Sequence, residues 1–587
     1  MRGADTVAEL VRRQWGDHRI GLRDEHHTLT HHQVAAGAAA RAALLVDLMP
    51  PRPGGEPHLG ILLDNTPEYP LWLSAAALAG AAVAGINPTR RGAELARDIR
   101  HTACRVLVTQ RAHLPLLDGL PLPGVRILVT DTDAYRELLA PYGSARPGDA
   151  RLGPVRPDSR FLLSFTSGST GAPKAALCSQ GRLAAAGASL AAHFSVGQDD
   201  VHYICMPMFH GNAVIADWAP ALSAGAGVAL RARFSASRFL SDVRGFEATY
   251  FTYVGRAVQY LLATPPTPDD HAHRLRLGFG TEAGAVDAAR FRKRFGVPLV
   301  EGYGSSEGGA SIQRTPDTPT GAVGRAAPDD DLVVVDADTG LVCPPARFSP
   351  TGRLLNASEA VGELVNRGRS AFEGYWRNPE ADAARLGWGR PQAEGSGGGC
   401  FWTGDLFYRD ADGYLYFAGR TDDRLRVDSE NLAAAMIEHI LARWDRAAGV
   451  AVYAIPDPVA GDQVMAALAL REGAVFDPAE FATFLAAQQD LGTKMPPRFV
   501  RVMPELPLTA TNKIHRVALR RASFLCADPV WWRPTPDAPY VRLTPAATAG
   551  LRAAYARHDR TPTPDHHVRP PGAPAVSDPA PDQDREP

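Results

Sequence analysis

The residues best suited to chemistry lie in the run FLLSFTSGSTGAPK, at positions 161–174, where an apolar stretch passes directly into hydroxyl and glycine residues and ends on a lysine. Glycine lets the backbone approach a polyphosphate closely, hydroxyl groups add hydrogen-bond donors, and an ammonium group adds positive charge. The run therefore predicts a loop that binds phosphate groups. The predicted contacts are Thr166, Ser167, Gly168, Ser169, Thr170, Gly171 and Lys174.

This run differs from the phosphate loop of P-loop kinases. The GxxxxGK[ST] pattern of that loop needs a glycine directly before the lysine, whereas Pro173 precedes Lys174 here. A serine- and glycine-rich run is, by itself, most often a flexible turn. The ten-residue pattern FTSGSTGAPK is far more specific than such a turn.

Four further motifs follow along the chain: GFGTEAG at 278–284, YGSSEGG at 303–309, WTGDLFYRDADGYLYFAGRTDD at 402–423 and PLTATNKIHR at 507–516. Together with FTSGSTGAPK they resemble the signature motifs of the adenylate-forming (ANL) superfamily, which includes acyl-CoA synthetases, nonribosomal-peptide adenylation domains and luciferases. The five matches keep the family's order and cover positions 165–516.

The resemblance implies the nucleotide contacts. In that family the aromatic residue of the second motif stacks on adenine, the hydroxyl residue binds the α-phosphate and the glutamate helps to hold Mg²⁺. An aromatic ring offers a flat face to a base, and a carboxylate beside a polyphosphate needs a cation between them. The corresponding residues here are Tyr303, Ser306 and Glu307, and the adenine-contacting segment implies Gly280, Thr281 and Glu282.

The two remaining motifs imply ribose binding, a hinge and a catalytic lysine. Asp405 resembles the family's ribose-binding aspartate, Arg420 the arginine that supports it, and Asp422 the hinge residue. Taken singly, an aspartate beside glycine is commonest as a turn former. Lys513 resembles the lysine that bridges the substrate carboxylate and the α-phosphate. That role is electrostatic, because a carboxylate attacking a phosphate brings two anions together.

The implied activity is that of an ATP-dependent acyl-CoA ligase. A fatty acid would react with ATP to form acyl-AMP and pyrophosphate, and the acyl group would pass to the thiol of coenzyme A. The segment DSENLAAAMIE at 428–438 is similar to the GEN pattern of the fatty-acid-transport-protein and very-long-chain acyl-CoA synthetase branch, with Ser429 in place of glycine. The resemblance to that branch implies a long-chain acid. The run PMFHGNAV at 207–214 lacks the aspartate of amino-acid-activating relatives, which favours an uncharged acyl tail.

The apolar residues from His210 to Trp218 fit either the wall of an acyl pocket or a plain core helix. Two other activities stay open within the superfamily: an acyl-AMP ligase that loads a carrier protein, and a non-catalytic relative. A dinucleotide-dependent oxidoreductase is a more distant alternative, because Gly278, Gly280 and Ala283 spell GxGxxA. That reading explains none of the other four motifs.

The elements that must position these residues alternate between short β-rich runs and alanine-rich helical stretches, as expected for an α/β fold. Residues 1–419 are predicted to form an AMP-binding region of two α/β subdomains with a small β-barrel or sheet at about 321–369. A small, mobile α+β domain carrying Lys513 is predicted over 420–535. Residues 536–587 are rich in proline and predict a disordered tail.

Composition excludes several other classes of protein. Sixty-two Lys and Arg residues nearly balance 64 Asp and Glu residues, so charge does not suggest nucleic acid as a partner. Six cysteines without a CxxC pair argue against a zinc knuckle or a disulfide framework, and the N-terminus lacks the apolar core of a signal peptide. We expect a cytoplasmic enzyme and leave peripheral membrane contact open.

Two further features suggest ordinary structural roles. The uncharged stretch PLWLSAAALAGAAVAGINP at 70–88 is mostly alanine and glycine, which favours a buried core helix over a membrane span. Three pairs of adjacent histidines lie in polar segments without a carboxylate or cysteine at metal-ligand spacing, so we expect solvated side chains. The pairs are His26 and His27, His31 and His32, and His566 and His567.

The implied role of Lys513 gives a direct test. We expect Lys513→Ala to stop formation of the acyl-adenylate and to spare thioester formation from supplied acyl-AMP, because the second step needs no neutralisation of an attacking carboxylate. Pyrophosphate exchange measures the first step and acyl-CoA release from acyl-AMP the second. Equal losses in both assays would contradict this division of labour.

Overall fold

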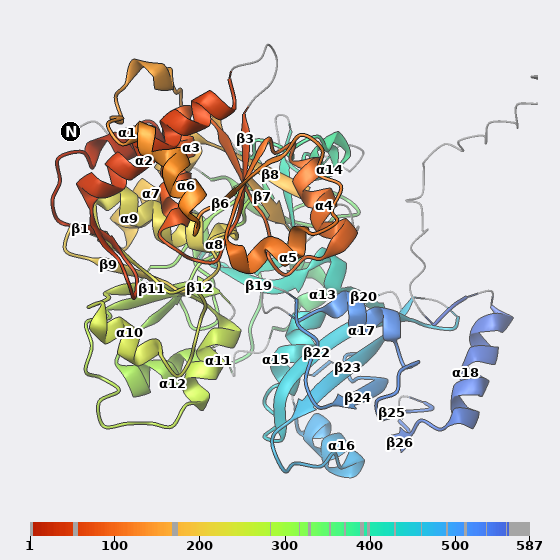
Figure 1. Ribbon diagram of the computed structural model, residues 1–587. Helices are drawn as coiled ribbons and strands as arrows, with labels where there is room; N and C mark the ends of the chain where they lie inside the picture. Colours follow the sequence, from red (N-terminus) through yellow and green to blue (C-terminus); the bar gives the residue numbers. More distant parts are fainter. Residues whose placement is uncertain are drawn as a thin grey trace, which may run out of the picture. The chain divides into compact units, whose positions relative to one another are not determined.

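The computed structural model describes the chain except residues 1–3, 51–56, 167–173, 282, 284, 316, 327–329, 351–353, 369–370, 388–392, 396–398, 428–429, 460, 489–490, 493, 510–513, 536, 559 and 563–587. The chain divides into two compact units, with the main division between Asp422 and Asp423. The first unit comprises the described residues up to Asp422, and the second comprises the described residues from Asp423 onward. The mixed α/β class is confirmed by the sheets and helices of both units (Figure 1).

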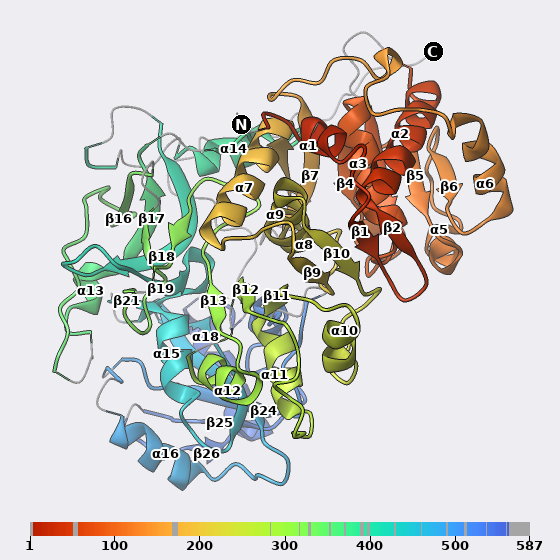
Figure 2. The same cartoon turned by 90° about the vertical axis from the view of Figure 1, so that its left-hand side faces the viewer.

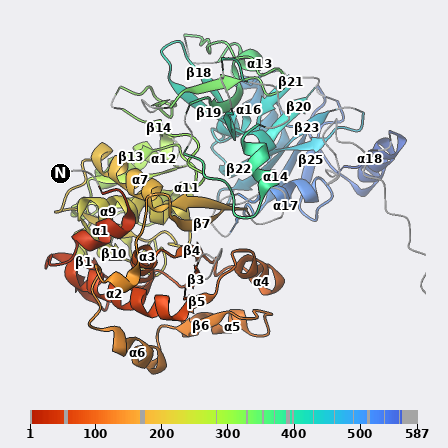
Figure 3. The same ribbon diagram turned by 90° about the horizontal axis from the view of Figure 1, so that it is seen from above.

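The first sheet has six strands in the order β6-β5-β3-β4-β7-β8, and all are parallel except the edge strand β8 (Figure 3). Its central strands are continuous apolar runs, as expected when both faces are covered by helices. The strands are β3 (His58–Leu62), β4 (Ala82–Gly85), β5 (Val106–Thr109), β6 (Arg126–Val129), β7 (Arg160–Thr166) and β8 (Lys174–Ser179). The helices around it are α1 (Val7–Arg13), α2 (His31–Leu48), α3 (Glu68–Ala79), α4 (Gly92–His101), α5 (Leu114–Leu117), α6 (Asp133–Leu139) and α7 (Gln180–His193).

The second sheet has seven strands in the order β13-β12-β11-β9-β10-β1-β2, with only β2 antiparallel to its neighbour. The carboxyl ends of β9, β11, β12 and β13 therefore lie along one edge, where α/β sheets usually bind ligands. The strands are β1 (Ile20–Arg23), β2 (Thr28–Thr30), β9 (Val201–Ile204), β10 (Gly227–Leu230), β11 (Tyr250–Val254), β12 (Leu277–Thr281) and β13 (Leu299–Glu301). The helices are α8 (Gly211–Ala213), a π-helical turn (Val214–Trp218), α9 (Ala219–Ala224), α10 (Phe239–Gly245), α11 (Gly255–Ala263) and α12 (Ala285–Phe295).

Helices join the two large sheets into one core. Helix α3 packs against α2, α7 packs against α9, and α1 contacts α3, α7 and α9 (Figure 2). Buried side chains from both sheets belong to the same apolar cluster, with Trp72 and Tyr203 among its largest members. A shared core of this size lets groups on one sheet be placed accurately against groups on the other.

A third, antiparallel sheet completes the first unit, in the order β16-β17-β18-β19. The predicted small β-barrel or sheet at 321–369 is thus part of a four-stranded sheet that continues to residue 420, because β18 and β19 form a hairpin on β17. The strands are β16 (Leu332–Val335), β17 (Gly362–Asn366), β18 (Phe401–Arg409) and β19 (Leu415–Arg420), beside the pair β14 (Ile312–Gln313) and β15 (Arg325–Ala326). Helices α13 (Ala357–Ala360) and α14 (Pro379–Arg385) lie in the connections.

The second unit is an α+β structure around a five-stranded sheet in the order β22-β23-β24-β25-β26. The strands are β22 (Ala447–Pro456), β23 (Asp462–Leu470), β24 (Phe499–Met503), β25 (Val530–Trp532) and β26 (Val541–Arg542), with a separate hairpin of β20 (Arg424–Val427) and β21 (Glu430–Ala433). The helices are α15 (Ala434–Leu441), α16 (Pro478–Ala487), α17 (Arg516–Ala522) and α18 (Pro545–Arg557). Arg516 bonds to the carboxylate of Glu438 at 2.8 Å and so connects α17 to α15.

The predicted tail begins too early. Residues 537–558 contain β26 and α18 rather than disordered chain. The side chain of Thr544 caps the first turn of α18, and Tyr555 is buried against Phe524 with its hydroxyl bonded to the Pro456 carbonyl. These tertiary contacts stabilise a helix that the proline-rich composition conceals. The part of the predicted tail from 563 to 587 lies outside the described residues.

The predicted core helix at 70–88 is half helix and half strand. Helix α3 is buried, as expected, but it ends at Gly80, which adopts a left-handed conformation with φ +66°. Glycine enters that region without steric cost and so ends the helix. Residues 82–85 then form β4 inside the first sheet. Throughout the described part of the chain, no helix combines the length and apolar character needed to span a bilayer.

The close packing of α7 on α9 gives a stability test. A Cβ on Gly187 would lie 2.6 Å from the backbone oxygen of Ala219, whereas a Cβ on the helical Gly245 would meet nothing within 4 Å. We expect Gly187→Ala to destabilise the first unit by about 1–3 kcal/mol. The matched Gly245→Ala should be neutral or stabilising by up to about 1 kcal/mol. Thermal and urea unfolding followed by circular dichroism measure both, and equal effects would contradict the packing argument.

Candidate adenylation site

The strands that flank the predicted phosphate loop form a hairpin. Strands β7 and β8 pair antiparallel, and Thr166 lies opposite Lys174 at the open end of that hairpin. The tertiary structure thus brings together the two ends of the predicted loop, with the half-buried Lys174 beginning the edge strand. The residues between them, Ser167, Gly168, Ser169, Thr170 and Gly171, lie outside the described residues, as do Glu282 and Lys513.

A buried carboxylate joins two of the predicted motifs. Asp405 is 8% exposed and accepts hydrogen bonds on both oxygens: from the hydroxyl of Tyr303 at 2.7 Å and from Nε of Arg420 at 3.1 Å. The register of β18 and β19 places Asp405 directly opposite Arg420. Burial, and then the Asp405 carboxylate, raise the pKa of the Tyr303 hydroxyl, so that it remains a donor. Three residues predicted to contact the nucleotide therefore form one group.

The ring of Tyr303 stands beside the third sheet. It forms a T-shaped pair with the ring of Phe407, with 4.9 Å between centroids. Tyr303 follows β13, at the carboxyl edge of the second sheet, and forms an isolated bridge with Ile312. Its orientation is thus fixed by contacts from two sheets.

Glu307 is the predicted metal ligand and is 7% exposed. Its Oε1 accepts a hydrogen bond from the hydroxyl of Tyr375 at 2.9 Å and lies 4.0 Å from Nη2 of Arg385. Within the described part of the chain, its Oε2 accepts no hydrogen bond, so that oxygen can face a cation. Mg²⁺ in nucleotide enzymes is usually held by one or two carboxylates together with phosphates and water. Glu307 alone is therefore enough as the protein's carboxylate ligand for such an ion. Among the described residues, no cluster of three metal-ligating side chains occurs.

The side chain of Ser306 lies beside Gly211. Its Oγ lies 2.7 Å from the position that a Cβ on Gly211 would take, and its backbone carbonyl accepts a hydrogen bond from Arg182 at 2.6 Å. A side chain at position 211 would therefore collide with the Ser306 hydroxyl. This contact joins the predicted α-phosphate ligand to the segment that follows His210.

The glycine-rich segment at 278–284 begins inside a strand. Gly278 and Gly280 both lie within β12, and a Cβ on Gly280 would be 2.2 Å from the backbone oxygen of Tyr253. Thr281 ends the strand and is half-buried. In a dinucleotide-binding fingerprint these glycines would form the turn after the strand. The oxidoreductase alternative thus has no support from the geometry.

An apolar cavity lies next to Ser306. We call it the His210 cavity. It is enclosed by α3, β4, β7 and the segment from Met208 to Val214. Its lining residues are Tyr69, Leu73, Val83, Gly85, Leu162, Leu163, Ser164, Met208, Phe209, His210, Gly211 and Val214. One of these lining residues, Gly211, borders Ser306.

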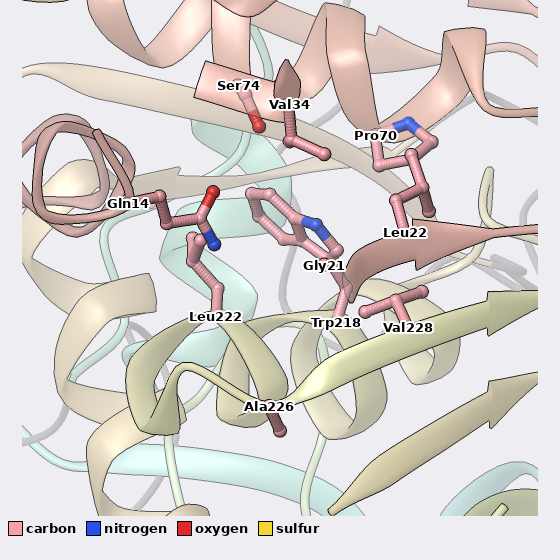
Figure 4. Close-up of a pocket in the computed structure, with 10 residues that line it drawn as sticks. All are labelled: Gln14, Gly21, Leu22, Val34, Pro70, Ser74, Trp218, Leu222, Ala226 and Val228. Carbon is pink, nitrogen blue, oxygen red and sulfur yellow. The ribbon is translucent and has the colours of Figure 1, made fainter. Parts of the chain in front are cut away.

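A second apolar cavity lies against a neighbouring face of α3 (Figure 4). We call it the Trp218 cavity. Trp218, Leu222 and Val34 point into it, together with the carboxamide of Gln14. It has no lining residue among those predicted to bind ATP. Its lining residues are Gln14, Gly21, Leu22, Val34, Pro70, Ser74, Trp218, Leu222, Ala226 and Val228.

Sequence reasoning missed Tyr375 and Arg385. Nε of Arg385 donates to the Tyr375 hydroxyl at 3.1 Å, and Nη1 donates to the carbonyls of Trp402 and Thr403. Arg385 thus connects the Glu307 group to the strand that carries Asp405. Tyr375 is 68 positions from Glu307, so no local spacing marks the pair.

The sequence comparisons agree with this geometry. Residues 9–376 match the family described as AMP-binding enzyme, and residues 436–513 match its C-terminal domain. The chain belongs to the AMP-binding enzyme family. The predicted membership of the adenylate-forming superfamily is confirmed, while the very-long-chain branch stays a prediction.

Among curated relatives, a steroid-22-oyl-CoA synthetase of Rhodococcus jostii is 47% identical over 94% of this chain and 98% of its own length. A medium/long-chain-fatty-acid–CoA ligase, FadD17, of Mycobacterium marinum is 44% identical over 88% of this chain and 95% of its own. The solved structure of an anthranilate CoA ligase, AuaEII, with anthranoyl-AMP has a TM-score of 0.74 and 22% identity, covering 89% of this chain and 97% of its own. That structure supports the fold alone.

The hydrogen bond from Tyr375 to Glu307 gives a test of the metal site. We expect Tyr375→Phe to raise the Mg²⁺ concentration needed for half-maximal ATP binding by about tenfold, because the carboxylate loses the donor that orients it. Calorimetric ATP titrations at several Mg²⁺ concentrations measure the shift. Tyr142→Phe, which removes a comparable bond to the exposed Asp47, is the control and should change nothing. An unchanged Mg²⁺ dependence in Tyr375→Phe would contradict the assignment.

Proposed function

We propose that this AMP-binding enzyme is an ATP-dependent acyl-CoA ligase that activates an apolar carboxylic acid as acyl-AMP, releases pyrophosphate and transfers the acyl group to coenzyme A. The main support is the close approach of Ser306, the residue before Glu307, to Gly211 in the wall of the His210 cavity. An acid in that cavity would present its carboxylate beside the residue proposed to hold the α-phosphate. Adenylation needs that juxtaposition.

The nucleotide contacts follow from the same geometry. We assign adenine stacking to Tyr303, with Gly280 and Thr281 at the neighbouring strand end, and ribose binding to Asp405. Both oxygens of Asp405 keep lone pairs for the ribose hydroxyls after accepting from Tyr303 and Arg420. The loop from Thr166 to Lys174, together with Glu282, would complete the pocket around the phosphates and base.

Magnesium would bind Glu307 and the phosphates of ATP. When bound, the ion would supply positive charge that offsets the repulsion between the attacking carboxylate and the phosphates. The chain's own part is to orient Glu307 through Tyr375 and to keep Ser306 in place through Arg182. Lys513 is proposed to add a second positive charge during adenylation.

The two units suggest a division of the reaction. We propose that Asp422, at the boundary between them, is the hinge about which the second unit turns between adenylation and thioester formation. The turn would remove Lys513 from the phosphates and admit the thiol of coenzyme A. Domain rotation of this kind is a common conformational step.

The acid is proposed to be a long-chain fatty acid. Most residues in the wall of the His210 cavity are apolar, which supports an acid with an uncharged tail. A carboxylic acid on a steroid side chain is the second candidate, favoured by the 47% identity to a steroid-22-oyl-CoA synthetase. Transfer to a carrier protein remains the alternative for the second step. A cytoplasmic location with peripheral membrane contact stays a prediction.

A substrate panel tests the proposal. The purified protein is incubated with ATP, Mg²⁺ and octanoate, palmitate or a steroid side-chain acid, with and without coenzyme A. We expect AMP release that depends on coenzyme A, and an acyl-CoA product identified by mass spectrometry. The preferred acid is read from kcat/KM. AMP release that is independent of coenzyme A would refute the proposed acceptor, and absence of turnover with every acid would refute the substrate class.

A further inference from the structure

The His210 cavity and the Trp218 cavity share two walls. Helix α3 contributes Tyr69 and Leu73 to the first cavity, and Pro70 and Ser74 to the second. The π turn likewise contributes its first residue, Val214, to the first cavity and its last, Trp218, to the second (Figure 4). Helix α3 and the π turn therefore form the wall that separates the two cavities.

The π turn has a cause in the sequence. In an uninterrupted α-helix the amide of residue 220 would donate to the carbonyl of Ala216, but Pro220 has no N–H group and its ring crowds that carbonyl. The amide of Ala219 instead donates to the carbonyl of Val214, which gives the wider turn. The freed carbonyl of Ala216 accepts a hydrogen bond from the Tyr250 hydroxyl at 3.0 Å.

A buried acid fixes the turn to the sheet beneath it. Asp217 is fully buried and its two oxygens are both used: Oδ1 is 2.8 Å from Nδ1 of His202 on β9, and Oδ2 accepts from the hydroxyl of Thr252 on β11 at 2.8 Å. The ring of His202, also fully buried, stacks on Tyr250 with centroids 4.2 Å apart. The side chains that form hydrogen bonds with the Ala216 carbonyl and the Asp217 carboxylate therefore belong to one packed cluster.

Stability alone explains this cluster poorly. Removing a carboxylate and an imidazole from water costs several kcal/mol, and apolar residues of similar size often serve as well or better. Burial accordingly raises the pKa of the Asp217 carboxyl. What such a pair supplies is a single preferred geometry, because any other position of the turn would leave a buried polar group without its partner.

We propose that Asp217, held by His202 and Thr252, is a specificity-determining residue that limits the length of the acyl tail by keeping the π turn between the two cavities. Pro220 sets the π geometry, whereas Asp217 attaches the turn to β9 and β11; without that attachment the turn would be free to shift against the sheet. Trp218 would then leave its present place and the tail could extend from the His210 cavity into the Trp218 cavity. This inference rests on the proposed function, since it takes the His210 cavity as the acid site.

The test compares a long and a short acid on defined variants. The double variant His202→Leu/Asp217→Leu replaces the polar pair by apolar groups and should raise the ratio of kcat/KM for palmitate over octanoate by at least about tenfold. The KM for ATP should stay within about twofold of the wild-type value, because the nucleotide groups are untouched. The single variant Asp217→Asn keeps a side-chain oxygen acceptor for His202, so its ratio of kcat/KM for palmitate over octanoate should equal that of the wild type. Thr252→Val, which removes one hydrogen bond, should shift the ratio in the same direction by less.

Asp242→Asn is the matched control. Asp242 is also buried and accepts from Tyr203, the residue next to His202 on the same strand, but it lines neither cavity. It should lower stability without changing the ratio. A ratio that stays within about twofold of wild type in the double variant, or in Thr252→Val should the double variant fail to fold, would overturn this inference alone. A wild-type enzyme that activates neither acid would instead refute the proposed function.

Discussion

A buried carboxylate that needs a hydrogen-bond donor on each oxygen is the constraint on which the proposed nucleotide site depends. Taking Asp405 out of water is tolerable only if both of its oxygens keep hydrogen-bond donors. Tyr303, from the edge of the second sheet, and Arg420, from the next strand of the third sheet, supply them. Satisfying this one group therefore fixes how two sheets meet, and it does so where the base and ribose are proposed to bind.

The same network extends to the proposed metal ligand. Arg385 bonds to the strand just before Asp405 and to Tyr375, and Tyr375 bonds to Glu307. The backbone at Tyr375 also pairs with Ala176 in β8, the strand that leaves the predicted phosphate loop. The groups proposed to bind ribose and metal are thus oriented by shared contacts, which is the arrangement that favours stabilisation of developing charge.

The acid side is built differently. The His210 cavity, the proposed acid site, has mostly apolar walls, so shape rather than charge would select the substrate there. The Asp217 cluster lies outside this wall and is proposed to act on the position of a helix turn. Chemistry and selectivity are therefore carried by separate elements that touch at Ser306 and Gly211, so a change in acid preference need not disturb ATP binding.

The sequence by itself determined the superfamily, the α/β class and the order of the nucleotide motifs, because backbone approach to phosphate and charge neutralisation demand particular residues at short, local spacings. It also predicted the strands around 58–62, 106–109, 126–129 and 250–254, because apolar runs bounded by turns have few other structures. Only the tertiary structure decided which distant residues form hydrogen bonds: Tyr375 with Glu307, His202 with Asp217, and Tyr555 with Pro456. The last of these bonds helps to order a stretch whose composition predicts a disordered tail. Such contacts depend on how whole sheets pack, and no periodicity within a short stretch of chain encodes them.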